Sequence, residues 1–162
     1  TGTISLIAGT SSGIEPFFAL GLSRRLLDGT RFVEINPLVA SKLESLGAGA
    51  QAALQALEAS GTLRGLNGLP EDFRKVFPTA LEIEPAFHLR MQAAFQTHVD
   101  AAVSKTVNLP HHAPPGTVRE IFLLAQKLHL KGVTVYRYGC RGGQPLSLID
   151  EEARPDCREC AV

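Results

Sequence analysis

The chain has 162 residues, balances 16 basic against 16 acidic side chains, and contains three cysteines. This length suffices for a domain with a buried core, and the balanced charge offers no basic field for nucleic acid. No apolar run reaches the roughly 20 residues of a membrane helix, so we expect neither a membrane partner nor, given the balanced charge, a nucleic-acid partner. Three cysteines make no disulfide framework, and we therefore expect a cytoplasmic protein.

The first residues, Thr1, Gly2, Thr3 and Ile4, predict the start of a helix. Backbone N–H groups at such a start lack partners within the helix, and together with the threonine hydroxyls they would suit a phosphate. The spacing alone favours an ordinary N-terminal cap over an anion site. No Gly-Lys-Ser/Thr follows, so this is not a Walker loop.

A β-hairpin is expected next. Residues 14–22 are mostly apolar and predict a buried strand, and residues 30–35 alternate and predict the returning strand. Asp28-Gly29 supplies the turn, and Arg24 and Arg25 are placed at the solvent end of the first strand.

A helical region follows the hairpin. Asn36-Pro37 predicts its start, and its Ala- and Leu-rich sequence extends to about Ser60. Gly47 and Gly49 weaken the middle, so one long helix and two shorter helices both remain open. A further short helix is expected over Glu71–Val76.

The centre of the predicted fold is a helix–strand unit that begins near residue 87. Its helix carries an apolar face with a repeat of four residues, formed by Phe87, Met91, Phe95, Val99 and Val103. The segment 104–109 then alternates, which predicts a short strand ended by Pro110.

A second helix–strand unit follows directly. Thr117 and Glu120 have the spacing of a capping box and predict the helix start, and Gly132 predicts its end. The expected buried face consists of Ile121, Leu124, Ala125 and Leu128. Val133–Arg137 predicts the next strand, and a crossover of this kind makes the two strands parallel.

The sequence contains two groups of potential metal ligands. The adjacent His111 and His112 have no acid or cysteine at ligand spacing, so we interpret them as surface residues and predict no metal site. Cys157 and Cys160 form a Cys-x-x-Cys pair on a tail that lacks an apolar pattern. A dithiol–disulfide shuttle is favoured there over half of a zinc knuckle, because no second ligand pair is present.

Three segments, TGTISLIAGTSSGIEPFFAL, MQAAFQTHVDAAVSKTVNLP and LKGVTVYRYGCR, together resemble the adenosylcobalamin-dependent (class II) ribonucleotide reductases. The resemblance implies an α/β fold, namely the closing part of the ten-stranded α/β barrel, with four or five strands and helices outside. It assigns residues 1–139 to the barrel, with a variable helical insertion at about 38–76, and residues 140–162 to a flexible tail. Because the chain opens within a family loop, we expect a fragment of a longer chain.

The resemblance also implies roles for individual residues. In the family a Pro-Thr-Gly-Thr/Ser-Ile loop holds the substrate phosphates, which makes the phosphate interpretation of Thr1, Gly2, Thr3 and Ile4 the favoured one. Cys157 and Cys160 match the terminal pair that reduces the active-site disulfide. The thiyl cysteine with its Asn and Glu partners is absent from the sequence, and Cys140 stands where the family commonly has Ser. No catalytic residue is therefore expected here, and the isolated chain is predicted to be inactive.

The expected function is that of the C-terminal part of a vitamin B12-dependent ribonucleoside-diphosphate reductase, which makes deoxyribonucleotides with adenosylcobalamin as the cofactor of the full-length enzyme. Its partners would be the remainder of the reductase chain, the nucleotide substrate and a thioredoxin- or glutaredoxin-like reductant, with a homodimer left open. The choice between di- and triphosphate substrates is also left open. The alternatives are a stand-alone, non-catalytic nucleotide-binding module and an interaction domain that recruits a thioredoxin-like partner.

Overall fold

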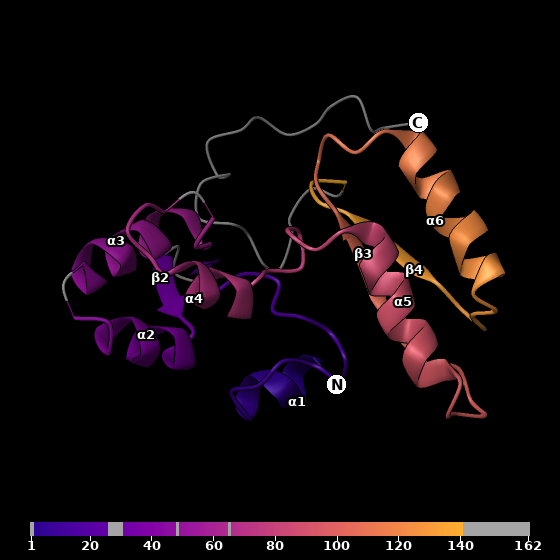
Figure 1. Cartoon of the computed structure of the whole chain (residues 1–162), viewed down its shortest axis with the longest axis horizontal. Coiled ribbons are helices and arrows are strands. Elements are labelled where there is room, and N and C mark those ends of the chain that lie inside the picture. The colour runs from indigo at the N-terminus through magenta and orange to yellow at the C-terminus, as the bar shows by residue number, and fades with distance from the viewer. Residues whose placement is uncertain (1, 26–30, 48, 65, 141–162) are drawn as a thin grey trace. The chain divides into compact units, whose positions relative to one another are not determined.

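The computed structural model describes residues 2–25, 31–47, 49–64 and 66–140 (Figure 1). These residues form two compact units, one made of residues 2–16 and 80–140 and the other of residues 17–79. Each unit has its own apolar core. The second unit contains the whole of the predicted insertion at 38–76, whereas the predicted tail beyond Cys140 lies outside the described residues.

The unit of residues 17–79 is built on a hairpin. Strand β1 (Gly21–Arg25) pairs antiparallel with β2 (Arg31–Ile35), with Gly21 opposite Ile35. The returning strand is confirmed, but the prediction of a strand over residues 14–22 is wrong. The N–H groups of Leu20 and Gly21 both donate to the Gly61 carbonyl, so this backbone is held by a loop before it enters the sheet. The Asp28-Gly29 turn and the side chains of Arg24 and Arg25 lie outside the described part.

Two helices, not one, follow the hairpin, and the choice left open by the sequence is thereby decided. Helix α2 (Pro37–Glu44) starts at Asn36, whose side-chain oxygen accepts hydrogen bonds from the Leu38 and Val39 N–H groups, as a cap should. Gly47 and Gly49 both have positive φ, of 70° and 94°, and separate α2 from α3 (Ala50–Ser60).

Helix α3 packs against α2 and against both strands of the hairpin, and α4 (Glu71–Val76) matches its predicted bounds. Gly61 ends α3 with φ of +72°, and a Cβ at this position would lie 2.6 Å from the Gly21 carbonyl oxygen. Only glycine therefore permits the close approach of α3 to β1. The core of this unit is formed by Leu20, Val39, Leu43, Ala53, Leu57, Leu63 and Phe73.

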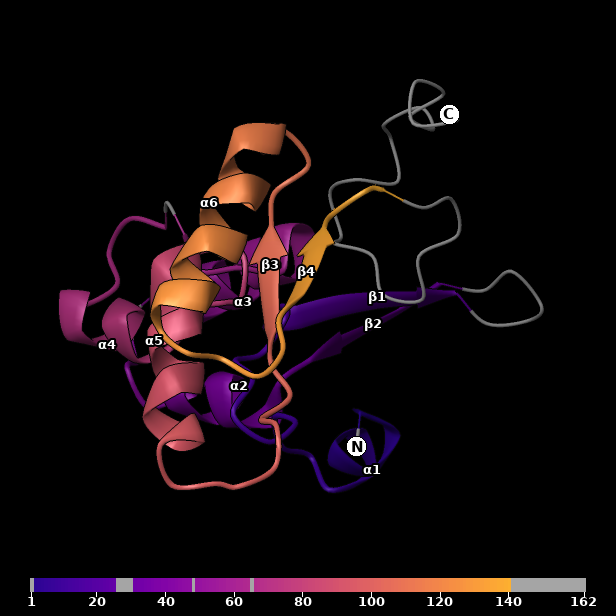
Figure 2. The same cartoon turned by 90° about the vertical axis from the view of Figure 1, so that its right-hand side faces the viewer.

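The other unit contains the βαβ arrangement expected from the sequence. Strand β3 (Thr106–Leu109) pairs parallel with β4 (Thr134–Arg137), with Thr106 opposite Thr134. Helices α5 (Pro85–Gln96) and α6 (Pro115–Lys127) contact each other and lie on the same side of the strand pair (Figure 2). The described ranges thus hold four strands in two separate two-stranded sheets, which fits part of a barrel.

The packing of α5 differs from the prediction in two respects. The helix ends at Gln96 and does not continue to Val103, because the Gln96 amide donates to the Val99 and Ala101 carbonyls and closes the chain into a turn. The predicted apolar face is not buried either. The buried residues of α5 are His88, Leu89 and Gln92, while Phe87, Met91, Phe95 and Val99 are exposed.

Helix α6 starts two residues before its predicted start. Pro114 precedes it in extended conformation and Pro115 occupies the first turn, so Thr117 lies inside the helix and the predicted capping box is wrong. The predicted face does point to the core of this unit: Ile121 and Ala125 are buried in it, and the partly buried Leu124 and Leu128 pack against it.

The end of α6 also differs from the prediction. The helix ends at Lys127, and His129, with φ of 54°, takes the left-handed position that was expected of Gly132. The Leu130 N–H then donates to the Ala125 carbonyl, a bond typical of such helix ends. In the described part of the chain, no helix combines the length and apolarity needed to cross a bilayer.

Candidate functional site

A partly buried ion pair joins the loop after α1 (Gly2–Ile7) to the start of β3. Glu15 Oε2 lies 2.7 Å from Lys105 Nζ, and Glu15 Oε1 accepts a hydrogen bond of 2.6 Å from the Thr106 N–H. The Lys105 side chain is 2% exposed and the Glu15 side chain 25% exposed. The pair was not predicted, because its two residues lie 90 positions apart and no sequence pattern links them.

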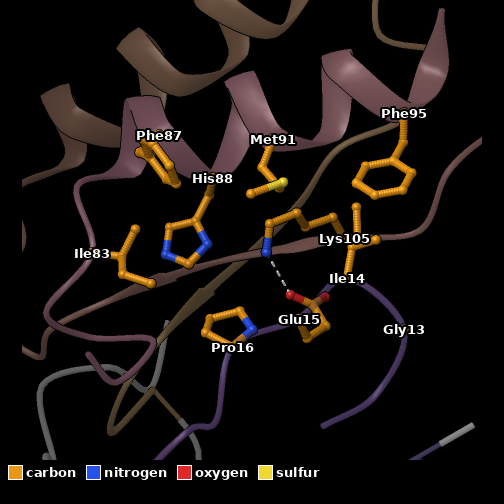
Figure 3. Close-up of a pocket in the computed structure, with 10 residues that line it drawn as sticks. All are labelled: Gly13, Ile14, Glu15, Pro16, Ile83, Phe87, His88, Met91, Phe95 and Lys105. Carbon is orange, nitrogen blue, oxygen red and sulfur yellow. Dashed lines mark hydrogen bonds and ion pairs between the residues drawn. The ribbon is translucent and has the colours of Figure 1, made fainter. Parts of the chain in front are cut away.

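The ion pair lies in a pocket of about 380 Å³ (Figure 3). Most of the wall is apolar and comes from the Gly13–Pro16 loop, the connector before α5, and one side of α5 itself. The lining residues are Gly13, Ile14, Glu15, Pro16, Ile83, Phe87, His88, Met91, Phe95 and Lys105. The exposed apolar residues of α5 are therefore part of a concave surface.

His88 is the third polar residue of the pocket. Burial lowers its pKa from 6.5, and the nearby Lys105 charge lowers it further, against the opposing effects of the Ala80 carbonyl and of Glu15. The imidazole is therefore neutral at pH 7, and its Nε2 lies 3.1 Å from the Ala80 carbonyl oxygen, to which it donates in the tautomer that satisfies both groups. Nδ1 is buried without a hydrogen-bond partner. The sequence analysis missed His88, which occupies a position next to the expected apolar face.

The predicted phosphate-binding residues are only partly described. Helix α1 begins at Gly2, as the sequence predicts, and Ile4 is exposed, whereas Thr1 lies outside the described residues. Among the α1 residues whose side chains are described, none lines the pocket. Two glycines with positive φ, Gly9 and Gly13, lie in the connection from α1 to Glu15.

The other candidate residues are not brought together. Cys140 follows β4 as a half-buried free thiol, and His111 and His112 are exposed after β3. Within the described ranges, no three His, Cys, Asp or Glu residues are placed to hold a metal ion. Cys157 and Cys160 lie outside the described residues.

The pocket does not fit adenosylcobalamin. Its volume of about 380 Å³ is far too small for a corrin macrocycle with its nucleotide tail. Its two charged groups already satisfy each other. We therefore assign no cobalamin-binding role to the residues of this pocket.

Comparisons with known proteins agree with this partial-barrel architecture. The family model of the ribonucleotide reductase barrel domain matches residues 1–136. The chain is 50% identical over 147 residues to the vitamin B12-dependent ribonucleoside-diphosphate reductase of Mycobacterium tuberculosis strain H37Rv, covering 91% of this chain and 21% of that protein. It is 42% identical over 160 residues to the protein of the same name from Thermoplasma acidophilum, covering 98% of this chain and 21% of that protein.

A solved structure supports the fold. The class Id ribonucleotide reductase alpha subunit of Actinobacillus ureae superposes with a TM-score of 0.69 at 21% identity, covering 85% of this chain and 25% of that chain. The chain spans about a fifth of the length of the two B12-dependent relatives described above. The resemblance seen in the sequence is confirmed, and the chain belongs to the ribonucleotide reductase barrel-domain family.

Proposed function

We propose that this chain is the C-terminal part of a vitamin B12-dependent ribonucleotide reductase, which converts ribonucleotides to deoxyribonucleotides by cobalamin-initiated radical chemistry. The observation that carries the proposal is 50% identity over 147 residues to a vitamin B12-dependent ribonucleoside-diphosphate reductase. When bound to the complete enzyme, adenosylcobalamin would supply the radical. The described residues of this chain would contribute barrel structure and substrate binding.

The residues Thr1, Gly2, Thr3 and Ile4 are proposed to hold the substrate phosphates. The support is their match to the family loop and the start of α1 at Gly2, which leaves the first backbone N–H groups of the helix without helical acceptors. The Glu15–Lys105 pair would position this segment, because it fixes the connection after α1 to the first residue of β3.

Cys157 and Cys160 are proposed to act as a redox shuttle. The pair would reduce the active-site disulfide by thiol–disulfide exchange and become a disulfide itself, so that two electrons and two protons pass to the active-site cysteines. A thioredoxin- or glutaredoxin-like dithiol would then restore the pair. This role follows from the resemblance and from the Cys-x-x-Cys spacing.

The phosphate role is tested by turnover of the complete reductase with a ribonucleoside diphosphate, adenosylcobalamin and a dithiol. Thr3→Val should raise KM about tenfold or more, because a hydrogen bond to a charged group contributes about 1.5–3 kcal/mol. Thr10→Val, in the exposed turn after α1, is the matched control and should leave KM unchanged. Equal KM values for the two variants would contradict the phosphate role.

The redox role is tested in the same enzyme by substituting each cysteine and using thioredoxin as the reductant. Cys157→Ser or Cys160→Ser should abolish thioredoxin-driven turnover but leave the first turnover intact, because the active-site pair starts reduced. Loss of the first turnover as well would show that the two residues act elsewhere. Tight nucleotide binding by the 162-residue chain on its own would favour the stand-alone binding module instead.

A further inference from the structure

His88 is 1% exposed, yet only one of its two ring nitrogens has a hydrogen-bond partner. Nε2 donates to the Ala80 carbonyl, which leaves Nδ1 as a buried acceptor without a donor. A buried polar group without a partner lowers stability, so its presence in a native structure needs an explanation. Packing alone does not explain it, because an apolar side chain would fill a buried position without this cost.

A suitable donor lies in the same pocket. In Figure 3 the His88 ring stands next to the Lys105 ammonium, and one ring nitrogen faces it. An ammonium has three N–H donors, and the Glu15 carboxylate accepts one of them at 2.7 Å. A second N–H of Lys105 can therefore serve His88 Nδ1, directly or through one water, for which the pocket has room. The three side chains then form one polar network.

This network ends on the segment that carries the proposed phosphate-binding residues. Glu15 Oε1 accepts a hydrogen bond from the Thr106 N–H, so it attaches the connection after α1 to β3. Ile4 and Ile7 of α1 are 70% and 84% exposed, so neither side chain anchors the helix to the core of its own unit. The position of α1 relative to β3 therefore depends on the Glu15 carboxylate.

Two charged groups act on the His88 imidazole. Lys105, from the start of β3, lowers its pKa, and Glu15, from the loop after α1, raises it. The connector before α5 adds the hydrogen bond of the Ala80 carbonyl, and among the described residues no charge from the rest of that connector or from α6 contributes to the shift. His88 is therefore neutral near pH 7 and becomes cationic at acidic pH.

Protonation of His88 would disrupt the network. A proton taken up from solvent at Nδ1 turns the acceptor for Lys105 into a donor and places two cations side by side. The Glu15 carboxylate is the acceptor that the network offers to the new N–H. Its attraction to the imidazolium would compete with its hydrogen bond to Thr106 and loosen the connection after α1 from β3.

We propose that neutral His88 is a positioning residue for the substrate phosphates, acting through Lys105 and Glu15, and that its protonation releases the phosphate-binding segment. The inference rests on the proposed phosphate role of residues 1–4. It makes nucleotide binding, and not the radical chemistry, sensitive to acid.

Steady-state kinetics of the complete reductase with a ribonucleoside diphosphate, from pH 7.5 to 5.5, tests this inference. His88→Gln keeps one donor for the Ala80 carbonyl and one acceptor for Lys105 but cannot take up a proton. On acidification, the KM of the unsubstituted enzyme should rise about threefold or more beyond that of His88→Gln, because a hydrogen bond to a charged group is lost. The substrate phosphate also titrates in this range, but it does so equally for both enzymes.

His98, an exposed histidine just after α5, supplies the matched control. His98→Gln should retain the pH dependence of the unsubstituted enzyme. Parallel KM profiles for the unsubstituted enzyme and His88→Gln would overturn the inference, and so would a flattened profile for His98→Gln. A fall in kcat in place of the rise in KM would overturn it as well, because a positioning residue of this kind acts on binding.

Hydrogen exchange followed by mass spectrometry gives a second readout that needs no substitution. After correction for the intrinsic pH dependence of exchange, residues 104–109 of the complete enzyme should lose protection at pH 5.5, because the Thr106 N–H loses its acceptor, whereas α6 should not. Unchanged protection of residues 104–109 would overturn the inference. Thr3→Val at pH 7.5 tests the phosphate role separately: a normal KM would refute that role and this inference with it, whereas a raised KM with parallel pH profiles would refute the inference alone.

Discussion

Removing the charge of Glu15 should destabilise the unit of residues 2–16 and 80–140 more than removing the charge of Lys105. At 2.7 Å, two unit charges attract by about 6 kcal/mol at an effective dielectric constant of about 20. The cost of taking both groups out of water offsets much of this attraction. The loss of stability therefore depends on whether the substitution leaves a buried charged group without a partner.

Glu15→Gln leaves the Lys105 ammonium, 2% exposed, without a counter-charge. The glutamine oxygen can still accept from the Thr106 N–H, but its NH2 group then faces another donor. Breaking a buried pair in this way costs about 3–5 kcal/mol, and the 25% exposure of Glu15 places the expected value near 3 kcal/mol. Lys105→Met removes the buried charge and leaves Glu15 bonded to Thr106 and partly hydrated, so we expect a cost of about 1 kcal/mol.

Urea unfolding followed by far-UV circular dichroism measures these differences. With a slope of about 2 kcal/mol/M, Glu15→Gln should lower the midpoint by roughly 1.5 M. The double variant Glu15→Gln/Lys105→Met should recover most of this loss, because it no longer buries an unpaired ammonium. A cost below about 1 kcal/mol for Glu15→Gln, as for an exposed pair, or no recovery in the double variant, would refute the reasoning.

Three further predictions concern stability. Gln92→Met should cost about 2–3 kcal/mol in urea unfolding, because the buried Gln92 amide donates to the Val103 and Gly132 carbonyls and both would lose their donor; a neutral result would contradict this. Asn36→Ala should lower the stability of α2 by about 1 kcal/mol, and Asn36→Gly by only a few tenths, so equal losses would argue against the cap. Because the pKa of His88 is lowered from 6.5 by burial, the unfolded state binds more protons, and stability should fall as the pH drops below about 6.5. His88→Leu should flatten this dependence in unfolding experiments from pH 7.5 to 5, and an unchanged slope would exclude His88 as its source.

Local features of the chain could be predicted where short-range interactions or backbone preferences decide the structure. Asn36 before Pro37 specified the start of α2, because the Asn side chain can satisfy N–H groups that the first turn leaves free. Gly47 and Gly49 weakened the helical region as expected, and both adopt positive φ. The parallel pairing of β3 and β4 followed from a crossover helix between two short strands.

The family could also be predicted from the sequence, because its motifs are specific in residue type and order. The family model confirms this prediction. Roles that depend on Thr1, Cys157 or Cys160 remain predictions. They concern contacts with a substrate, a cofactor or a partner, which a single chain does not contain.

Tertiary structure alone decided which side of α5 is buried. Apolar residues at every fourth position predicted a buried side with Phe87, Met91 and Phe95, yet the side that packs carries His88 and Gln92. Polar side chains can be buried when partners from distant segments satisfy them, as the Val103 and Gly132 carbonyls do for the Gln92 amide. Phe87, Met91 and Phe95, on the other side of the helix, line the pocket instead.

The same reason explains why the Glu15–Lys105 pair and its pocket were not predicted. Periodicity reports only on neighbours within one helix or strand. A contact across 90 positions depends on the path of the whole chain, which here carries the Gly13–Pro16 loop to the edge of β3. The sequence by itself therefore determined the family, the parallel β3–β4 pair and most helix positions, while burial and long-range polar contacts were decided by the packing of segments far apart in the chain.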